Sequence, residues 1–219
     1  MKSIILIAAP AAGKGTEADM LKEDFNLPHI STGDILRKKS EENSELGKEI
    51  LDKISNGKFV SDELMISLLK ERIQNNDCQQ GYILDGFPRN ISQALSYEKM
   101  LDELSKELGL VIVIDIDKEV AKSRIEGRRT CPNCGKIYNI NEIKPKQEGI
   151  CDNCLTPLMK RKDYNSSTYD ERYKTYIEKT APLIDYYNKK GVLYHVDGSK
   201  GKTDTHDQIK KIIAANENK

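Results

Sequence analysis

The feature that most constrains this chain is a short apolar run that ends in a small-residue loop and leads into a helix. The run covers residues 3–7, and residues 8–16 read Ala-Ala-Pro-Ala-Ala-Gly-Lys-Gly-Thr. In such a unit, backbone N–H groups line a concave nest, the helix start adds its positive dipole end, and the lysine adds a point charge. We interpret residues 8–16 as a phosphate-binding loop, although Ala8 and Ala11 stand where the usual pattern has glycine.

The same residues also admit an interpretation as a secretory signal peptide. Lys2, an apolar stretch and an Ala-x-Ala sequence are all present there. However, the apolar core at residues 4–9 is shorter than the roughly 7–15 residues that such a signal needs. Because Gly13 and Lys14 follow at once, the phosphate-binding interpretation is favoured.

Composition limits the classes of protein that this chain can belong to. Its 219 residues suit one large domain, or a core with small insertions. The 35 Lys and Arg residues balance the 35 Asp and Glu residues, which argues against a nucleic-acid or membrane-surface binder. No apolar run approaches the ~20 residues of a membrane span. We therefore expect a protein without nucleic-acid or membrane partners, located in the cytoplasm.

Four of the five cysteines form a pattern of two C-x2-C pairs separated by sixteen residues. This spacing is typical of a tetrahedral zinc site in which each pair offers two sulfurs. Two disulfides or redox-active pairs are the alternatives, but disulfides are rare in a reducing compartment. We predict structural zinc bound by Cys131, Cys134, Cys151 and Cys154, whereas Cys78 lies in a polar segment and has no assigned role.

Short apolar runs alternate with longer amphipathic segments, which predicts a parallel sheet with crossover helices. The expected strands are residues 3–9, 81–85, 110–117 and 191–197, with 27–30 as a weaker candidate. The expected helices are residues 15–25, 61–75, 91–108, 118–128, 167–190 and 204–215. Two further segments are expected to extend beyond the core: the polar, helical residues 32–55 and the cysteine-containing residues 130–163.

Arginines and turn motifs recur after the expected strands. A single arginine on an amphipathic helix is usually solvated, and Thr32-Gly33-Asp34 can be only a turn with a helix N-cap. Together with a phosphate-binding loop, however, several separated arginines suit the transfer of a phosphoryl group between two polyanions. Catalysis of that reaction is mostly positioning and charge neutralisation, and arginine makes forked contacts to phosphate oxygens.

The chain resembles the adenylate kinases in its motifs and in their order. These motifs are Gly13-Lys14-Gly15-Thr16, Ser31-Thr32-Gly33-Asp34, Asp85-Gly86-Phe87-Pro88-Arg89, Gly127-Arg128-Arg129, the four-cysteine segment and Thr180-Ala181-Pro182-Leu183-Ile184. The resemblance covers essentially the whole chain and is closest to the long bacterial form with a zinc-bearing lid. It implies an α/β fold with a P-loop and a five-stranded parallel sheet flanked by helices. The implied parts are a core (1–30, 61–126 and 165–219), an AMP-binding arm (31–60) and a lid (127–164).

The resemblance also implies a role for individual residues. The ATP side would comprise Gly13, Lys14, Gly15, Thr16, Arg124, Arg128 and Lys200. The AMP side would comprise Thr32, Arg37, Val60, Gly86, Arg89, Gln93, Arg161 and Arg172. The catalytic set would be Lys14, Arg89, Arg128, Arg161 and Arg172. Asp85 would hold the waters of Mg²⁺, although Asp115 and Asp117 also end an expected strand and compete for this role.

The resulting interpretation is a monomeric kinase that converts Mg-ATP and AMP into two ADP, with structural zinc in its lid. A different nucleoside monophosphate as acceptor is one alternative, although Gln93 and Thr32 favour adenine. The second alternative is a nucleotide-binding protein with impaired turnover, because Ala8 and Ala11 replace loop glycines. Tyr164 is a further departure, since the family often has an aspartate at this position.

Overall fold

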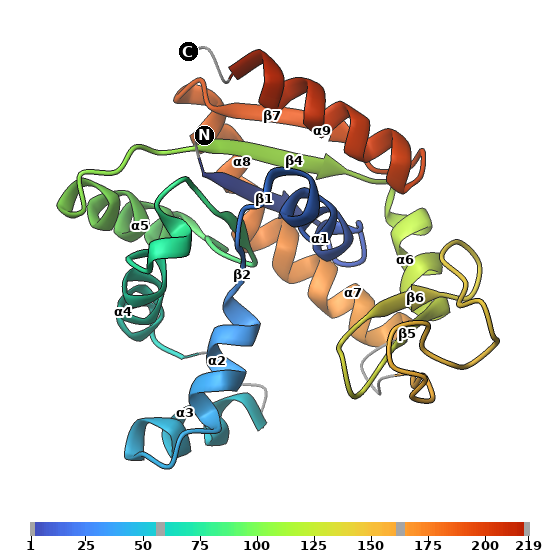
Figure 1. Cartoon of the computed structure of the whole chain (residues 1–219). Coiled ribbons are helices and arrows are strands. Elements are labelled where there is room, and N and C mark those ends of the chain that lie inside the picture. Colours follow the sequence, from blue (N-terminus) through green and yellow to red (C-terminus); the bar gives the residue numbers. More distant parts are fainter. Residues whose placement is uncertain (1–2, 56–59, 161–164, 217–219) are drawn as a thin grey trace.

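The computed structural model describes residues 3–55, 60–160 and 165–216. It has a central sheet covered by helices, from which two parts project (Figure 1). The strands of the sheet are β1 (Ile4–Ala8), β2 (His29–Ser31), β3 (Ile83–Asp85), β4 (Leu110–Asp115) and β7 (Leu193–Asp197). They lie in the order β2-β3-β1-β4-β7, and every neighbouring pair is parallel. The predicted five-stranded parallel sheet is therefore confirmed.

The middle of the sheet is buried on both faces. β4 is a continuous apolar run in which Val111, Ile112 and Val113 are fully buried, as is typical of a strand covered from both sides. In β1, Leu6 pairs in register with Asp85 of β3 and with Ile112 of β4. Because the strands are parallel, their carboxyl ends meet along one edge, and the loops that carry the phosphate-loop and Asp-Gly-Phe-Pro motifs lie there.

Different helices cover the two faces of the sheet. The helices are α1 (Lys14–Phe25), α2 (Thr32–Ser40), α3 (Glu45–Ser55), α4 (Asp62–Ile73), α5 (Ile91–Glu103), α6 (Lys118–Gly127), α7 (Ser166–Thr175), α8 (Pro182–Lys189) and α9 (Lys202–Asn216). Ile4 and Leu6 belong to a buried cluster with residues of α1 and α9, whereas Ile5 and Ile7 belong to one with residues of α4, α5 and α8. This alternation follows from the two-residue period of a strand.

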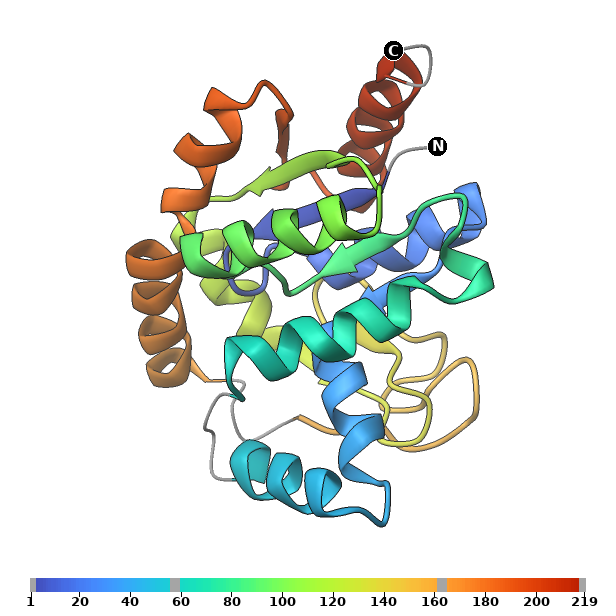
Figure 2. The ribbon, with the colours of Figure 1, turned by 90° about the vertical axis from the view of Figure 1, so that its left-hand side faces the viewer.

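Two parts project from the same end of the core (Figures 1 and 2). The first contains α2 and α3, and it begins where the Ser31 hydroxyl accepts a hydrogen bond from the Asp34 backbone N–H and caps α2. The second contains the antiparallel pair β5 (Arg128–Thr130) and β6 (Ile137–Asn139), which lies between α6 and α7. We refer to the first part as the arm and to the second, between α6 and α7, as the lid.

Several predicted helices are shorter than expected or divided. The predicted helix 167–190 consists of α7, a π-helical turn at Tyr176–Thr180, and α8. Pro182 begins α8, a position where a proline removes no helical hydrogen bond. The predicted helix 32–55 is interrupted between α2 and α3, and the predicted helix 91–108 ends at Glu103. No helix in the described ranges has both the length and the apolar character needed to cross a bilayer.

Replacing a buried isoleucine of β4 will test how far the core depends on this strand. Ile112→Ala removes apolar contacts in a fully buried site and is expected to lower the free energy of unfolding by about 2–5 kcal/mol. Ile140→Ala is the matched control, because Ile140 is 46% exposed and belongs to the lid. Denaturant titration of both variants provides the measurement. Equal losses of stability in the two variants would contradict this account of the core.

Candidate active site

A cleft of about 1480 Å³ lies at the carboxyl edge of the sheet. Its walls come from the β1–α1 loop, the start of α2, the β3–α5 loop, the end of α6, the lid and α7. Most of the sequence-predicted site residues line it, although they come from segments far apart in the chain. The members of this set are Gly13, Lys14, Gly15, Thr16, Thr32, Arg37, Asp85, Gly86, Arg89, Arg124, Arg128 and Arg172.

The β1–α1 loop adopts left-handed backbone conformations at two positions. Ala11 has φ 64° and Gly13 has φ 96°. Holding an alanine in this region costs about 1–2 kcal/mol, which a folded domain can absorb, whereas Ala8 is the last residue of β1. Gly13 is the N-cap of α1 and has no side chain to cap it. The first backbone N–H groups of α1 are therefore available to an anion in the cleft.

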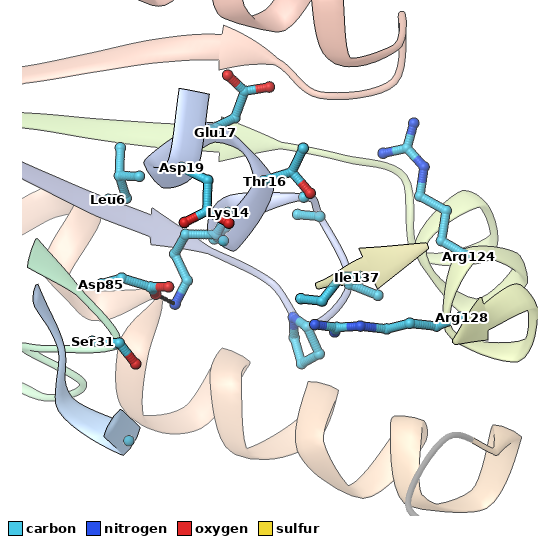
Figure 3. Close-up of a pocket in the computed structure, with 18 of the residues that line it drawn as sticks. Leu6, Lys14, Thr16, Glu17, Asp19, Ser31, Asp85, Arg124, Arg128 and Ile137 are labelled. Carbon is cyan, nitrogen blue, oxygen red and sulfur yellow. Dashed lines mark ion pairs between the residues drawn. The ribbon is translucent and has the colours of Figure 1, made fainter. Parts of the chain in front are cut away.

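The carboxylate of Asp85 is held between two basic side chains. Lys14 Nζ lies 2.7 Å from Asp85 Oδ1 (Figure 3), and His29 Nε2 lies 3.4 Å from Asp85 Oδ2. Burial alone would raise the pKa of Asp85, but Lys14 and His29 together hold it well below its usual range. Burial also opposes protonation of His29, yet Asp19 and Asp85 raise the pKa of His29 to about 9. Asp85 is therefore ionised at neutral pH and has a cationic neighbour on each side.

The other two candidate aspartates have different partners. Asp115 Oδ2 lies 2.6 Å from His195 Nδ1 on β7. Asp117 is the N-cap of α6, and its Oδ1 accepts a hydrogen bond from the Glu119 backbone N–H at 2.8 Å. Neither residue lines the cleft. Of the three carboxylates that the sequence suggested for magnesium, Asp85 alone faces the phosphate-binding loop.

Arg89 and Thr32 converge on one backbone carbonyl. Arg89 Nε donates to Gly86 O at 2.7 Å, and Thr32 Oγ1 donates to the same oxygen at 3.2 Å. Gly86 has φ +83°, and an added Cβ would lie 3.0 Å from Thr32 Oγ1. Desolvation in the crowded cleft lowers the pKa of Arg89, although solvent still reaches its side chain. The charge of Arg172 lowers this pKa further, whereas the charge of Asp85 raises it. These contacts keep the Arg89 guanidinium inside the cleft.

Arg124 of α6 and Arg128, the first residue of β5, lie on the lid side of the cleft. Arg128 extends from the end of α6 towards the phosphate-binding loop (Figure 3). Arg124 Nη1 donates to Gly198 O at 2.8 Å, and its Nε donates to Glu142 of the lid at 2.9 Å. Arg172 reaches the cleft from α7. The positively charged groups therefore approach the cleft from the core, the lid boundary and the helix that follows the lid.

Three of the predicted nucleotide-binding residues, Val60, Gln93 and Lys200, are not among the described residues that line the cleft. Val60 packs against the core, and the Gln93 amide lies beside Arg89, whose backbone N–H donates to Gln93 Oε1 at 2.8 Å. Lys200 Nζ lies 3.5 Å from Asp197, and it is Gly201 and Lys202 of this segment that line the cleft. Arg161 lies outside the described residues.

The four cysteines of the lid converge on one point. Their sulfurs all lie within 4.8 Å of one another, with Cys131 and Cys154 at 3.3 Å and Cys134 and Cys151 at 3.5 Å. None of these residues forms a disulfide. A tetrahedral zinc with Zn–S distances of about 2.3 Å places its sulfurs about 3.8 Å apart. The donor set and its spacing therefore fit a structural metal ion, and four sulfurs leave no open position for a substrate.

A buried tyrosine supports this cysteine cluster. The Asp152 backbone N–H donates to Tyr138 Oη at 2.8 Å, and the same hydroxyl lies 3.5 Å from Cys151 Sγ. When the sulfur is deprotonated, as metal binding requires, the hydroxyl hydrogen points to Cys151. Tyr138 therefore connects the second cysteine pair to β6, the strand that follows the first cysteine pair.

Sequence reasoning missed both His29 and Tyr138. Each lies within a three-residue strand, and each has a partner in a later segment of the chain, Asp85 for His29 and Cys151 for Tyr138. His29 had one available signal, because it lies two residues before the Ser31-Thr32-Gly33-Asp34 motif. A titratable side chain so close to a predicted phosphate site could have been included as a candidate.

Known proteins match this chain over nearly its whole length. The family model described as adenylate kinase matches residues 6–192. The adenylate kinase of Kosmotoga olearia is 47% identical over 197 residues, which cover 90% of this chain and 92% of that protein. The adenylate kinase of Thermotoga petrophila is 42% identical over 214 residues, or 97% of both chains. That of Archaeoglobus fulgidus is 43% identical over 211 residues, or 96% of this chain and 97% of the relative.

Proposed function

The chain belongs to the adenylate kinase family and transfers a phosphoryl group between ATP and AMP, and we propose that the cleft residues divide this reaction as follows. An oxygen of the AMP phosphate attacks the γ-phosphorus of ATP, and the bond from that phosphorus to the β-phosphate bridging oxygen breaks. Two ADP result, with no covalent enzyme intermediate. The observation that supports this assignment is the meeting of Lys14, Arg89, Arg128 and Arg172 in one cleft.

We assign the ATP phosphates to the β1–α1 loop. Its backbone N–H groups and the start of α1 would bind the phosphate oxygens, while Lys14 would leave Asp85 and contact the β- and γ-phosphates. Arg128 would neutralise charge that develops during transfer, and Arg124 would flank the adenine. Gly201 and Lys202 line this side of the cleft, so the segment near Lys200 would complete the ATP side.

We assign the AMP phosphate to the opposite wall of the cleft. Arg89 lies beside Thr32 and Gly86 there, and Arg37 lines the cleft from α2. A guanidinium can make forked contacts to phosphate oxygens, so Arg89 would orient the attacking group. Gln93 and Val60 would contact the base. Arg172, together with Arg161, would bind the group in transit.

Two metal ions enter this proposal. Mg²⁺ enters the cleft with ATP as part of the substrate, and Asp85 would hold its water ligands once Lys14 has moved to the phosphates. In the lid, Cys131, Cys134, Cys151 and Cys154 would bind a structural zinc ion, for which their sulfur donors and mutual spacing are suited. The zinc would stabilise the fold of the lid and take no part in the chemistry.

The proposed division of the chain follows the projecting segments of the fold. Residues 31–60 would form the AMP-binding arm and 127–164 the lid, with the remaining residues as the core. Closure of both over the substrates would exclude water, which could otherwise accept the phosphoryl group. Five free thiols are compatible with a reducing compartment, and we propose a cytoplasmic monomer.

The direct test of this assignment is the formation of ADP from ATP and AMP in a coupled assay. Omission of AMP is the control, because ADP formed without it would report hydrolysis. We expect ADP to form at twice the rate of ATP loss, as the proposed stoichiometry requires. Zinc should be quantified on the same sample.

Arg89→Lys is expected to be a poor enzyme even though it keeps the charge. An ammonium cannot reproduce the forked contact, and the loss of such a charge-assisted bond costs about 1.5–3 kcal/mol. The expected decrease in kcat/KM for AMP is therefore roughly ten- to a hundredfold. Arg72→Lys, outside the cleft and paired with Asp77, is the matched control and should retain wild-type kinetics. Unchanged AMP kinetics in Arg89→Lys would remove Arg89 from the site.

Removal of the lid metal is expected to destabilise the lid and leave the core folded. We expect about one zinc per chain, and metal binding supplies much of the folding free energy of small metal-bound segments. Cys151→Ala should lose the zinc and lower the melting temperature, whereas Cys78→Ala should keep the zinc. Metal analysis and calorimetry provide the measurements. A metal-free wild-type protein that melts like the metal-bound one would contradict this prediction.

The loop alanines are expected to leave the enzyme active. Ala11 already has the left-handed conformation that a glycine would adopt there, and neither alanine removes a backbone N–H. The structure thus gives no support to the alternative of impaired turnover. Ala11→Gly should change kcat/KM for ATP by less than about fivefold, or roughly 1 kcal/mol. Ala8→Gly is the control at a β-strand position. A gain of a hundredfold in Ala11→Gly would show that the loop is impaired.

A further inference from the structure

The side-chain amide of Gln93 is fixed by two groups of opposite hydrogen-bonding character. Gln93 lies in the first turn of α5, where its backbone N–H donates to Asn90 Oδ1 at 2.9 Å. Its Oε1 accepts from the Arg89 backbone N–H at 2.8 Å, and its Nε2 donates to Asp62 Oδ1 at 2.7 Å. Asp62 is the first residue of α4, the helix that packs beside α5.

These two partners allow only one orientation of the amide. A backbone N–H can only donate, and an ionised carboxylate can only accept. If the amide turned by 180°, its NH₂ group would face the Arg89 N–H and its oxygen would face the Asp62 carboxylate. Both hydrogen bonds would be replaced by repulsive contacts. Asp62 and the Arg89 backbone N–H therefore together determine which end of the Gln93 side chain is the donor and which is the acceptor.

The fixed amide still has one acceptor position and one donor to offer. Oε1 has a second lone pair, and Nε2 has a second hydrogen. The adenine edge presents the complementary pair, an N6 amino donor beside the N1 acceptor. Bases with a 6-oxo group, such as guanine and hypoxanthine, present an O6 acceptor beside an N1–H donor, which is the reverse order. An amide that cannot turn can form both hydrogen bonds with the adenine edge, whereas it faces repulsive contacts with the edge of a 6-oxo base.

We propose that Asp62 is a specificity-determining positioning residue, which holds the Gln93 amide in the orientation that selects a 6-amino purine as the phosphoryl acceptor. This inference rests on the proposed contact between Gln93 and the AMP base. Asp62 need not touch the nucleotide, because its effect passes through Gln93. The location agrees with this role, since Val60, the other residue assigned to the base, lies two positions before Asp62.

If Asp62 only stabilised α4, removal of its charge and removal of the neighbouring Glu63 charge would have similar effects. Asp62 and Glu63 are both acidic residues in the first turn of α4, where negative charge interacts favourably with the helix dipole. Glu63 is exposed, and the described contacts of Gln93 do not include it. Glu63→Gln therefore removes the same charge from the same helix turn without changing the Gln93 amide, and it is the matched control.

The experiment compares AMP with inosine monophosphate as acceptors, because their bases differ at the 6-substituent and at protonation of N1. The quantity measured is the ratio of kcat/KM for AMP to kcat/KM for inosine monophosphate. This ratio does not depend on the folded fraction of a variant. In Asp62→Asn and Asp62→Ser we expect it to fall about tenfold or more, mainly because KM for AMP rises. KM for ATP should stay within about twofold of wild type, and Glu63→Gln should keep the wild-type ratio.

A second set of variants separates this inference from the assignment on which it rests. Gln93→Ala should lower the ratio by itself, and adding Asp62→Asn to it should change nothing further, because both act through one amide. If Gln93→Ala keeps the wild-type ratio, the assignment of Gln93 to the base is wrong. If Gln93→Ala lowers the ratio and Asp62→Asn does not, Asp62 has no role in selectivity. Equal effects of Asp62→Asn and Glu63→Gln would likewise overturn the inference.

Discussion

The contact between Lys14 and Asp85 is the interaction around which the cleft is arranged. It depends on the parallel pairing of β1 with β3, which places Asp85 beside Leu6 and at the edge where the phosphate-binding loop begins. A half-buried carboxylate is costly unless it has a partner. Because His29 contacts the other oxygen of Asp85, the carboxylate keeps one cationic neighbour when an anion attracts Lys14 away. The Lys14 side chain can thus move to a ligand without leaving Asp85 unpaired.

Backbone carbonyls fix the positions of two arginines of the cleft. Arg89 is held by the carbonyl of Gly86, and Arg124 donates to the carbonyl of Gly198 as well as to Glu142. A carbonyl orients a guanidinium but does not neutralise it, so Arg89 keeps its positive charge in the cleft, whereas Glu142 offsets that of Arg124. A chain with no net charge can therefore still attract polyanions, because such attraction depends on the local distribution of charge.

The sequence predicts best those features whose signal lies within a short segment. The phosphate-binding loop, the apolar run of β4 and the paired cysteines are of this kind, and the structure contains the predicted parallel sheet and cysteine cluster. The partners of Gln93 and His29 could not be predicted, because they depend on how α4 packs against α5 and how β2 pairs with β3. The left-handed conformation of Ala11 could likewise not be predicted, because the loop around it imposes this conformation against the preference of alanine.

The attachment of the lid has a consequence for how the chain tolerates change. Lys118 and Lys122 of α6 lie 3.1 and 2.9 Å from Asp170 of α7, and Tyr169 donates to the Lys118 carbonyl. The two helices that flank the lid are thus joined by contacts outside it, so the core itself brings the ends of this insertion together. The entropy of closing such a loop grows only slowly with its length. A segment of different length or composition could therefore replace the lid between α6 and α7 while the sheet keeps its order, which makes this junction a natural point for exchange of modules.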